Sequence, residues 1–341
     1  MRRIAICLLA LAASGVAHAA EPVRIRMAIT GATGDVVFWA GRERGYFRDE
    51  GIDLEIIKFD SGARMMAPLG AGELDVATGG QSAGFFNAVA RGIDIKILAD
   101  KTQTIPGLGT QSLVVRKDHI ASGRYKTLAD LKGMKMASPA PGASATTVLT
   151  KMLAKGGLTT GDIDQVFMAN PQVATAFANK ALDAALPTEP GVSLALATGA
   201  VQKVLEDHDV YPEHQIAVIF YSGAFMRDRK DAAIGFMRAY LRSVRDYNDA
   251  MVAGDLVGPK GDAMIDVLTR FGPSQDPAFY RSFKLGYCDP NGALHLGSLA
   301  EDLEIFRKEG LIEGAVTLTQ SVDTQFIDAA LQQVGPYRPA R

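Results

Sequence analysis

The residues best suited to chemistry lie in the stretch VATGGQSAGFF, residues 76–86. It contains Gly80-Gln81-Ser82-Ala83-Gly84, which matches the G-x-S-x-G pattern that places a nucleophilic serine on a sharp turn between a strand and a helix. A short apolar run precedes this turn, and a helix-like run follows it. One hypothesis is therefore a serine hydrolase that uses Ser82 as its nucleophile.

The rest of the sequence weakens this hydrolase hypothesis. A catalytic triad needs a later acid and a later histidine, and His119, His208, His214 and His295 are available. However, no histidine- and glycine-rich segment precedes Ser82 to form an oxyanion hole. Only three short strands are expected before this turn, which is early for the centre of a hydrolase sheet. We therefore expect a binding turn here and no catalytic residues.

Patterns for metal and cofactor binding are missing from the sequence. There is no H-E-x-x-H and no paired cysteine motif, so no metal site is expected. The glycines of GATG, residues 31–34, have the wrong spacing for a P-loop or a dinucleotide fingerprint, so no cofactor is expected. The formal net charge is −2, and a mildly acidic protein is a poor partner for nucleic acid or anionic membranes.

Residues 1–19 have the pattern of a secretory signal peptide. Two arginines precede the apolar run IAICLLALAA, and AHA at 17–19 is a small-x-small cleavage site. We expect cleavage near Ala19 and a periplasmic protein. Cys7 lies inside the apolar run, so no lipid anchor is expected, and Cys288 alone forms no internal disulfide.

A glycine-containing turn, ASPAPGASATT at 137–147, is a candidate binding element. It ends an expected strand and opens an expected helix. Gly142 would allow close backbone approach, and Ala143 and Ser144 would present amide N–H groups at the helix N-terminus. The partial positive charge there suits a carboxylate, sulfonate or phosphate. The alternative is an ordinary helix capped by serine.

Further candidate residues follow neighbouring strands, whose carboxyl ends should meet at one edge of a sheet. Asp35 could cap a helix or recognise a ligand donor. Trp39 could stack on a ligand or pack in the core. Glu189 would favour an amine or amide over an anion. The predicted ligand-binding residues are Gly34, Asp35, Trp39, Ser61, Gly62, Gly79, Gly80, Gln81, Ser82, Gly142, Ala143, Ser144, Thr188 and Glu189.

The elements that position these residues alternate between strand and helix. Strand patterns occupy 23–30, 52–59, 74–80 and 93–100, and helices are expected over 36–51, 60–73 and 81–92. Such alternation predicts a mostly parallel sheet covered on both faces. A similar pattern runs from about residue 112 to 217, and the remainder is mainly helical.

The two parts of this pattern resemble each other. Leu74-Asp75 and Leu182-Asp183 each precede a short strand and a turn, and the strands before them begin with Ile52-Asp53 and Ile163-Asp164. This repetition predicts two similar α/β lobes, the second inserted into the first. Their facing strand ends would form a cleft, which is a favoured place for a small-molecule site.

Four segments, taken in order, carry a family resemblance. They are GATGDVVFWAGRERGYFRDEGIDLEII, LGAGELDVATGG, KTLADLKGMKMA and PNGALHLGSLAEDLEIFRKEGLI. Together with the N-terminal segment they resemble the periplasmic solute-binding proteins of ABC importers, in the branch that serves nitrate, taurine, alkanesulfonates and thiamine-precursor pyrimidines. The resemblance covers essentially the whole chain after the signal peptide. The family also has an enzyme branch with a cysteine cluster, which Cys288 alone does not supply.

The resemblance implies a fold and a mode of action. The fold would be α/β and of the two-lobed, type II-like periplasmic binding protein kind, each lobe a mostly parallel sheet flanked by helices, with two crossover strands. We expect lobe 1 at 20–116 and 218–341 and lobe 2 at 117–217, with crossovers near Val115 and Tyr221.

The same resemblance implies a binding role without catalysis. The protein would be a monomer that closes over one small polar solute of sulfonate, carboxylate or pyrimidine type and delivers it to an inner-membrane permease. The turn at Gly142 favours an anionic solute. The alternatives are an exported serine hydrolase that uses Ser82, and a sensor that presents the ligand to a membrane receptor.

Overall fold

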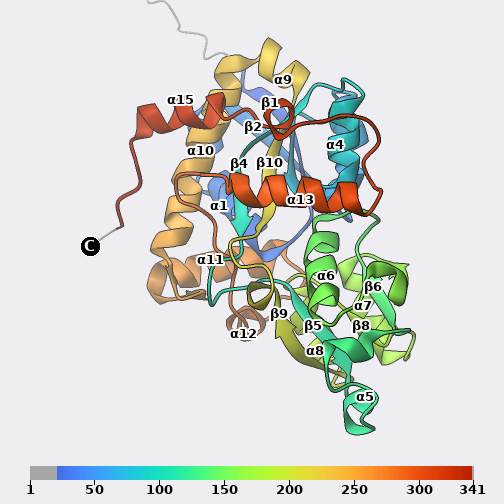
Figure 1. Cartoon of the computed structure of the whole chain (residues 1–341). Coiled ribbons are helices and arrows are strands. Elements are labelled where there is room, and N and C mark those ends of the chain that lie inside the picture. Colours follow the sequence, from blue (N-terminus) through green and yellow to red (C-terminus); the bar gives the residue numbers. More distant parts are fainter. Residues whose placement is uncertain (1–20, 340–341) are drawn as a thin grey trace, which may run out of the picture.

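Two five-stranded sheets divide the chain into two lobes (Figure 1). The computed structural model describes residues 21–339, except for the side chains of residues 170 and 171. The predicted signal peptide lies outside the described residues. None of the helices between residues 21 and 339 combines the length and the apolar composition that a membrane span requires.

The first lobe is built on a sheet with the strand order β2-β1-β3-β10-β4. β1 pairs in parallel with β2 and β3, whereas β10 runs antiparallel to β3 and β4. The strands are β1 (Val23–Ile29), β2 (Ile52–Lys58), β3 (Val76–Gly79), β4 (Ile95–Gln103) and β10 (Gln215–Ser222).

The helices of this lobe come from both ends of the chain. They are α1 (Val36–Glu43), α2 (Tyr46–Asp49), α3 (Gly62–Gly70), α4 (Ala83–Ala90), α9 (Gly223–Asp228), α10 (Lys230–Asp249), α11 (Gly258–Phe271), α12 (Pro277–Arg281), α13 (Leu296–Lys308), α14 (Leu318–Ser321) and α15 (Gln325–Val334), with the 3₁₀ turn η1 (Thr33–Asp35) and the strand pair β11 (Met251–Val252) and β12 (Asp255–Leu256).

The second lobe repeats this arrangement with the order β7-β6-β8-β5-β9, in which β5 is the one antiparallel strand. Its strands are β5 (Ser112–Arg116), β6 (Lys135–Ser138), β7 (Asp164–Phe167), β8 (Ala184–Ala185) and β9 (Val201–Glu206). Its helices are α5 (Lys117–Ala121), α6 (Ser144–Lys155), α7 (Asn170–Ala178) and α8 (Gly191–Ala197), with the 3₁₀ turns η2 (Leu128–Leu131), η3 (Thr160–Asp162) and η4 (Asp207–Asp209).

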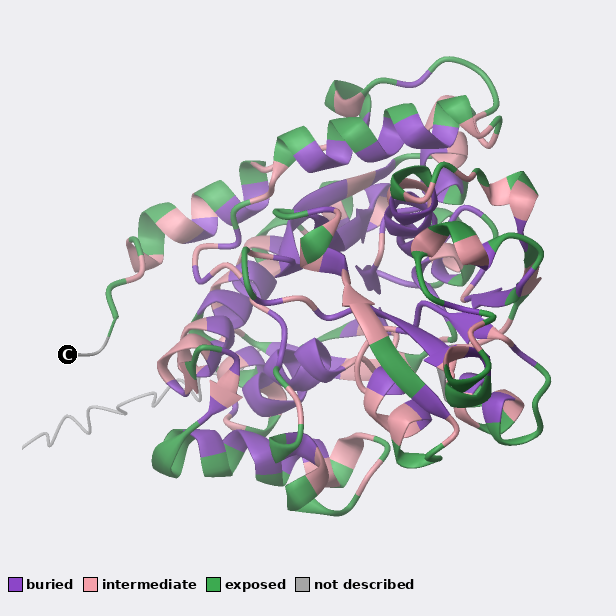
Figure 2. Ribbon diagram, turned by 60° about the horizontal axis from the view of Figure 1, so that its bottom comes forward, coloured by how far each residue is buried: buried purple, intermediate pink, exposed green. Residues whose placement is uncertain are grey.

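Apolar side chains pack on both faces of each sheet. On β1, Ile25, Met27 and Ile29 join the core under α1 and α10, whereas Ala28 faces the core under α3, α4 and α13. The central strands β3 and β10 are buried throughout, whereas the edge strands β7 and β9 are mostly exposed or half-buried. The helices that cover the sheets alternate between buried and exposed residues (Figure 2). A fully buried aliphatic side chain contributes ~1.5–3 kcal/mol. This core stabilises the fold without a disulfide, since Cys288 is a buried free thiol.

The repeated Leu-Asp pair has a structural cause. The Asp75 N–H donates to the Arg26 carbonyl at 2.9 Å, and its Oδ2 accepts from the Arg26 N–H at 2.8 Å. Asp183 makes the same two bonds with Lys135, at 2.9 and 3.0 Å. Arg26 lies in β1 and Lys135 in β6, which hold equivalent positions in the two sheets. The predicted similarity of the lobes is therefore confirmed.

The segment expected to form one helix over 36–51 forms two. Gly45 adopts φ 78°, in the left-handed region, between α1 and α2. This conformation ends a helix and is cheap only for glycine. The apolar pattern continues across the break, which is why the sequence suggested a single helix.

The chain passes between the lobes at other points than the sequence suggested. Val115 pairs with Ala184 inside the second sheet, and Tyr221 pairs with Val76 inside the first. The connecting segments are therefore 104–111 and 207–214. A buried strand has the same apolar pattern in either sheet, so the pattern alone does not say which sheet β5 joins.

Asp207 ties the two connecting segments together. Its Oδ2 accepts from the Thr104 hydroxyl at 3.0 Å and from the N–H groups of Thr110 and Gln111 at 3.4 and 3.2 Å. Burial raises the pKa of this carboxyl. A Cβ at Gly109 would lie 2.0 Å from Asp207 Oδ1, so the close approach of the two segments requires glycine at this position.

Candidate functional site

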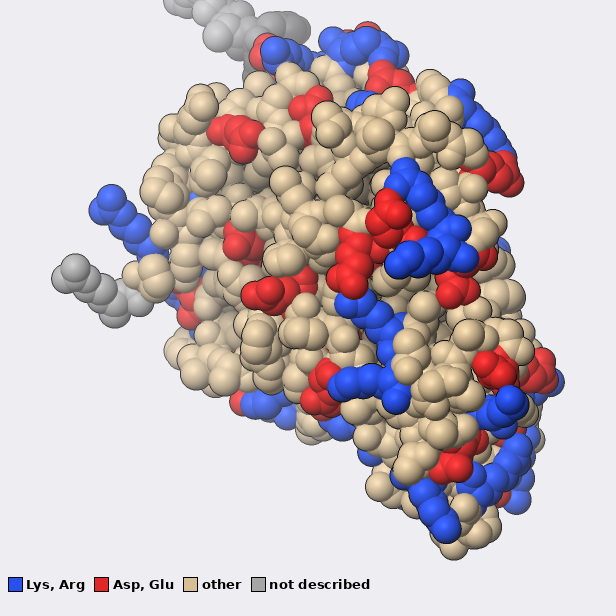
Figure 3. All heavy atoms as spheres, viewed as in Figure 1, with Lys and Arg blue, Asp and Glu red and all other residues tan. Residues whose placement is uncertain are grey.

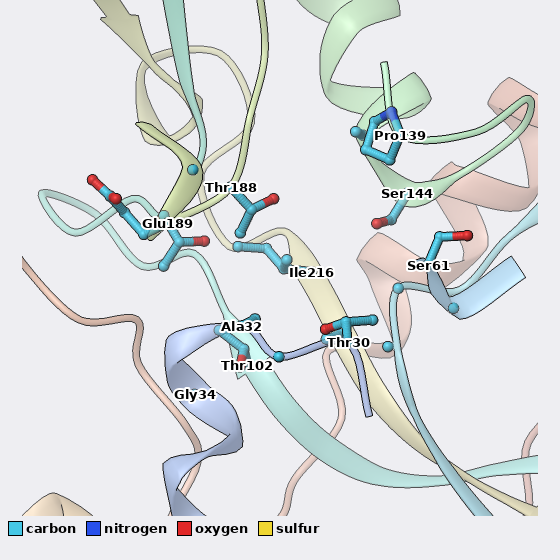
Figure 4. Close-up of a pocket in the computed structure, with 18 of the residues that line it drawn as sticks. Thr30, Ala32, Gly34, Ser61, Thr102, Pro139, Ser144, Thr188, Glu189 and Ile216 are labelled. Carbon is cyan, nitrogen blue, oxygen red and sulfur yellow. The ribbon is translucent and has the colours of Figure 1, made fainter. Parts of the chain in front are cut away.

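A cavity of about 320 Å³ lies between the lobes, where their strand ends face each other (Figure 4). Ser61 and Thr102 contribute from the first lobe, Pro139 and Thr188 from the second, and Ile216 from β10 next to a connecting segment. This volume is at the lower end of the range for small-molecule sites.

Nine of the fourteen predicted site residues line this cavity. They are Gly34, Ser61, Gly62, Gly79, Gly80, Ala143, Ser144, Thr188 and Glu189. The other five lie outside its wall: Asp35, Trp39, Gln81, Ser82 and Gly142.

Two helix N-termini, one from each lobe, border the cavity. Ser61 and Gly62 begin α3, and Ala143 and Ser144 begin α6. The N–H groups of a first helical turn have no partner inside the helix and carry partial positive charge. Neither N-cap side chain makes a capping bond. The alternative interpretation, an ordinary helix capped by serine, is wrong for α6, because its N-cap is Ala143.

The turns that carry these residues touch each other across the lobes. A Cβ at Gly80 would lie 2.0 Å from Ser144 Oγ and 2.7 Å from Ser144 Cβ. The Ala83 N–H donates to the Gly142 carbonyl at 2.9 Å. Gly142 thus contacts the opposite lobe and does not line the cavity. The described conformation has the lobes closed on this side.

The polar side chains of the Gly80–Ser82 turn point into the protein. Ser82 is 1% exposed, and its Oγ accepts from the Phe85 N–H at 3.1 Å, which caps α4. Gln81 is fully buried, and its amide donates to Asp302 on α13. The glycines of this turn therefore line the cavity, whereas its two polar side chains have structural contacts.

Asp35 and Trp39 also have structural surroundings. Asp35 makes no capping bond to α1; its Oδ1 lies 3.0 Å from Nζ of Lys101. Trp39 is 2% exposed and stacks on Phe271, with ring centroids 5.8 Å apart. The packing alternative is therefore the correct one for Trp39, and the helix-capping interpretation of Asp35 is wrong.

Lys101 is a cavity residue that the sequence reasoning missed. It lies in β4, is buried, and lines the cavity beside Thr102. The sequence did contain a sign of it, because the charged and polar run Asp100-Lys101-Thr102 follows the apolar stretch Ile97-Leu98-Ala99 near the end of the strand. Strand ends of this kind are where open α/β sheets bind ligands.

Several polar atoms in the cavity wall have no hydrogen-bond partner among residues 21–339. They are Ser61 Oγ, Thr110 Oγ1 and Gln111 Oε1, all on buried residues. Buried polar atoms are nearly always hydrogen-bonded in folded proteins. Their clustering around one cavity indicates a site for a polar ligand. Over the same described range, no cluster of His, Cys, Asp or Glu could hold a metal ion.

Glu189 lines the cavity, but its carboxyl group points toward α8. Its oxygens accept from the Ser193 N–H at 3.0 Å and from the Ser193 hydroxyl at 3.1 Å. Burial raises the pKa of Glu189 to about 7. The neighbouring Thr188 hydroxyl accepts from the Gln111 amide at 3.2 Å, so this turn is held against a connecting segment.

The raised pKa of Glu189 predicts a pH-dependent stability. The folded protein holds the Glu189 proton more tightly than the unfolded chain does. The contribution of this group to the unfolding free energy is therefore complete below about pH 4.5 and is lost as the pH rises through about 7. In Glu189→Gln the amide oxygen can still accept from the Ser193 N–H, the amide nitrogen can donate to the Ser193 hydroxyl, and the side chain does not ionise. We expect the variant to gain ~1–3 kcal/mol in unfolding free energy relative to the wild type between these pH values. Urea titrations across this range measure the difference, and parallel profiles would contradict it.

Polar contacts between the lobes continue on the surface where α13 lies between α4 and α6 (Figure 1). Lys151 on α6 pairs with Glu301 on α13 at 2.6 Å. Glu309, after α13, accepts from Thr150 and Thr160 at 3.4 and 2.6 Å. Basic and acidic side chains are interspersed over the viewed face (Figure 3).

Comparisons with known proteins agree with this architecture. Structures of similar fold include a nitrate-binding NrtA from Synechocystis PCC 6803, with a TM-score of 0.75, 14% identity and coverage of 92% of this chain and 90% of that one. An alkanesulfonate-binding SsuA from Xanthomonas axonopodis, bound to MOPS, has a TM-score of 0.71, 19% identity and coverage of 89% and 99%. The predicted two-lobed periplasmic binding protein fold is confirmed.

The names of the relatives found by sequence comparison do not specify a ligand. A protein of Brucella abortus, named only as a binding protein, is 28% identical over 210 residues, which is 61% of each chain. The match thus spans less than two thirds of that relative. A family model described as the NMT1-like family matches residues 18–255. This match covers more than half of the sequence, and the chain belongs to the NMT1-like family.

Proposed function

We propose that this protein is the periplasmic substrate-binding component of an ABC importer. It captures a small, polar, anionic organic solute in the interlobe cavity. The observation that carries this proposal is the convergence of the N-termini of α3 and α6 on one cavity from opposite lobes. Their N–H groups suit a carboxylate or sulfonate, and this site is complete only when the lobes are closed.

The solute would contact the wall that the two turns form. The hydroxyls of Ser61 and Ser144 lie beside the two helix N-termini (Figure 4). Apolar residues line other parts of the cavity, namely Phe59, Pro139, Leu194 and Ile216. This combination favours an organic acid with an apolar part over a bare inorganic ion. The named relatives that bind nitrate or an alkanesulfonate support an anionic solute.

Binding would proceed by closure of the lobes about the segments 104–111 and 207–214. These segments link the sheets and are joined by the Asp207 hydrogen bonds. A rotation here would separate Gly80 from Ser144 and open the cavity to solvent, which is a hinge motion of ordinary type.

The binding role implies a location, an oligomeric state and a protein partner. After cleavage near Ala19 the protein would act as a monomer in the periplasm, with an inner-membrane permease as its partner and without nucleic acid. A structure of an import-system ligand-binding component from Staphylococcus aureus, with a TM-score of 0.73 and 14% identity, supports the transport context. A ligand-presenting sensor would use the same clamp, and it would be supported instead if the closed protein binds a receptor and no permease.

Ser82→Ala separates the binding role from the serine hydrolase alternative, because only the hydrolase would lose catalytic activity in this variant. Because Ser82 Oγ caps α4, we expect the variant to lose ~1 kcal/mol of unfolding free energy and to bind its solute within about threefold of the wild type. Urea titration and calorimetry measure the two effects. A loss of several hundredfold in the hydrolysis of an activated ester would contradict the binding role.

A thermal-shift screen tests the proposal as a whole. The mature protein is mixed with sulfonates, carboxylates, nitrate and pyrimidines, and a solute present at 100 times its Kd should stabilise the folded state by ~2.7 kcal/mol. We expect the melting temperature to rise with an organic acid. If no solute raises it, the proposed function is wrong.

A further inference from the structure

Lys101 is a buried cation in the cavity wall with unused hydrogen-bond donors. Its side chain is 2% exposed, and the residue lines the cavity. Among residues 21–339, its ammonium group has one polar partner within bonding distance, Asp35, with Nζ 3.0 Å from Oδ1. An ammonium group carries three donors, so Asp35 leaves at least two of them unused.

The pairing with Asp35 positions this ammonium group. The Asp35 carboxylate is fully buried, and neither of its oxygens accepts a well-aligned hydrogen bond from a described residue. A buried ion pair with such incomplete hydrogen bonding adds little stability, which indicates a role other than stabilisation. A Cβ at Gly34 would lie 3.2 Å from Lys101 Nζ and 2.9 Å from Thr102 Oγ1, so glycine leaves room around the ammonium group.

Lys101 lies at a different end of the cavity from the α3 and α6 N-termini. It belongs to β4, which β10 separates from β3 and its Gly79–Gly80 turn. Two strand spacings correspond to ~10 Å. Ile216 and Ala217 of β10 line the cavity between these ends. The cavity thus has a polar region at each end, and the side chains between these ends are mainly apolar, with Thr30 as a polar exception (Figure 4).

We propose that Lys101 selects diacids, in which a second carboxylate lies at the opposite end from the group held between α3 and α6. Lys101 donates to an oxygen of that second carboxylate, and Asp35 holds the ammonium group in place. This inference rests on the proposed function, because it assigns the other end of the same cavity.

Matched pairs of probes test this selectivity by calorimetry. The pairs are adipate with hexanoate, and benzene-1,4-dicarboxylate with benzoate. A buried charged hydrogen bond corresponds to at least about a 30-fold change in affinity. We expect the diacid of at least one pair to bind at least about 30-fold more tightly than its monoacid.

Variants of Lys101 then test whether this residue causes the difference in affinity between diacids and monoacids. Lys101→Met leaves the Asp35 charge unpaired, so the variant can fold poorly. The double variant Lys101→Met/Asp35→Asn removes both charges and should fold. We expect it to lose the diacid preference while the monoacid affinity changes less than about threefold. Lys96→Met is the matched control, because Lys96 lies near the other end of β4 and donates to the Gln320 carbonyl.

The possible failures are distinguishable. If the monoacids bind as well as the diacids, or if the double variant keeps the preference, Lys101 has no selective role, and the proposed capture of an anionic solute still stands. If sulfonates or pyrimidines bind and neither diacid does, the inference is also overturned. If no solute of the wider screen binds, the proposed function fails with it.

Discussion

Gly80→Ala is expected to weaken solute binding by ~10–100-fold while leaving the separate lobes folded. The new Cβ would lie 2.0 Å from Ser144 Oγ, 2.7 Å from Ser144 Cβ and 3.2 Å from the Ile216 carbonyl oxygen. The Ser144 hydroxyl can rotate away, but its Cβ cannot. Overpacking of this kind costs ~1–3 kcal/mol. Because Ser144 lies on the opposite lobe, the cost falls on the closed conformation.

Calorimetry with the tightest solute of the screen measures this effect, and two variants control it. Ser144→Gly in the Gly80→Ala background removes both clashing atoms and should restore part of the affinity. Gly84→Ala lies in α4, where the nearest atom to the new Cβ is Ser82 Oγ at 3.7 Å, so binding should not change. Unchanged affinity in Gly80→Ala would mean that solute binding does not need the contact between these turns.

Asp302→Ala is expected to lower the unfolding free energy by ~3–5 kcal/mol. Asp302 is fully buried on α13 and accepts from the Tyr211 hydroxyl at 3.0 Å; its other oxygen lies 3.2 Å from His214 Nε2 and accepts from the Gln81 amide. Its removal leaves buried donors without their acceptor, which costs far more than the loss of a surface pair.

Urea unfolding measures this loss, with Glu304→Ala as the matched control. Glu304 lies on the same helix, is exposed and pairs with Arg307, so its removal should change the unfolding free energy by no more than about 0.5 kcal/mol. Asp302→Asn keeps the shape of the side chain and should fall between the two. Equal stability of the Asp302 and Glu304 variants would show that the contacts of Asp302 with Tyr211 and His214 do not stabilise the packing of α13 on the connecting segment 207–214.

Much of the fold follows from local sequence patterns. The alternation of strands and helices predicts the α/β class, and the Leu-Asp repeat reports a real hydrogen-bond pair in each lobe. The sheet membership of β5 and β10 could not be predicted, because it depends on pairing between segments distant in the chain. The break at Gly45 could have been anticipated, since glycine often ends a helix in the left-handed conformation.

The sequence predicts which backbone turns line the candidate site better than it predicts where their side chains point. The strand-end glycines had to face the cleft because parallel strands bring their carboxyl ends to one edge. The directions of Gln81 and Ser82 depend on Asp302 and on the helix α4 that Ser82 caps. Likewise, Asp35 is turned away from α1 by Lys101, which lies on a strand that sequence reasoning had not connected to it.

A structure of the protein with its tightest solute would show directly whether the interlobe cavity captures an acidic solute. We expect one solute molecule in this cavity, with its acidic group within hydrogen-bonding distance of Ser61 and Ser144 and of the first N–H groups of α3 and α6. A solute bound outside this cavity, or held by one lobe alone with its acidic group far from both helix N-termini, would contradict it.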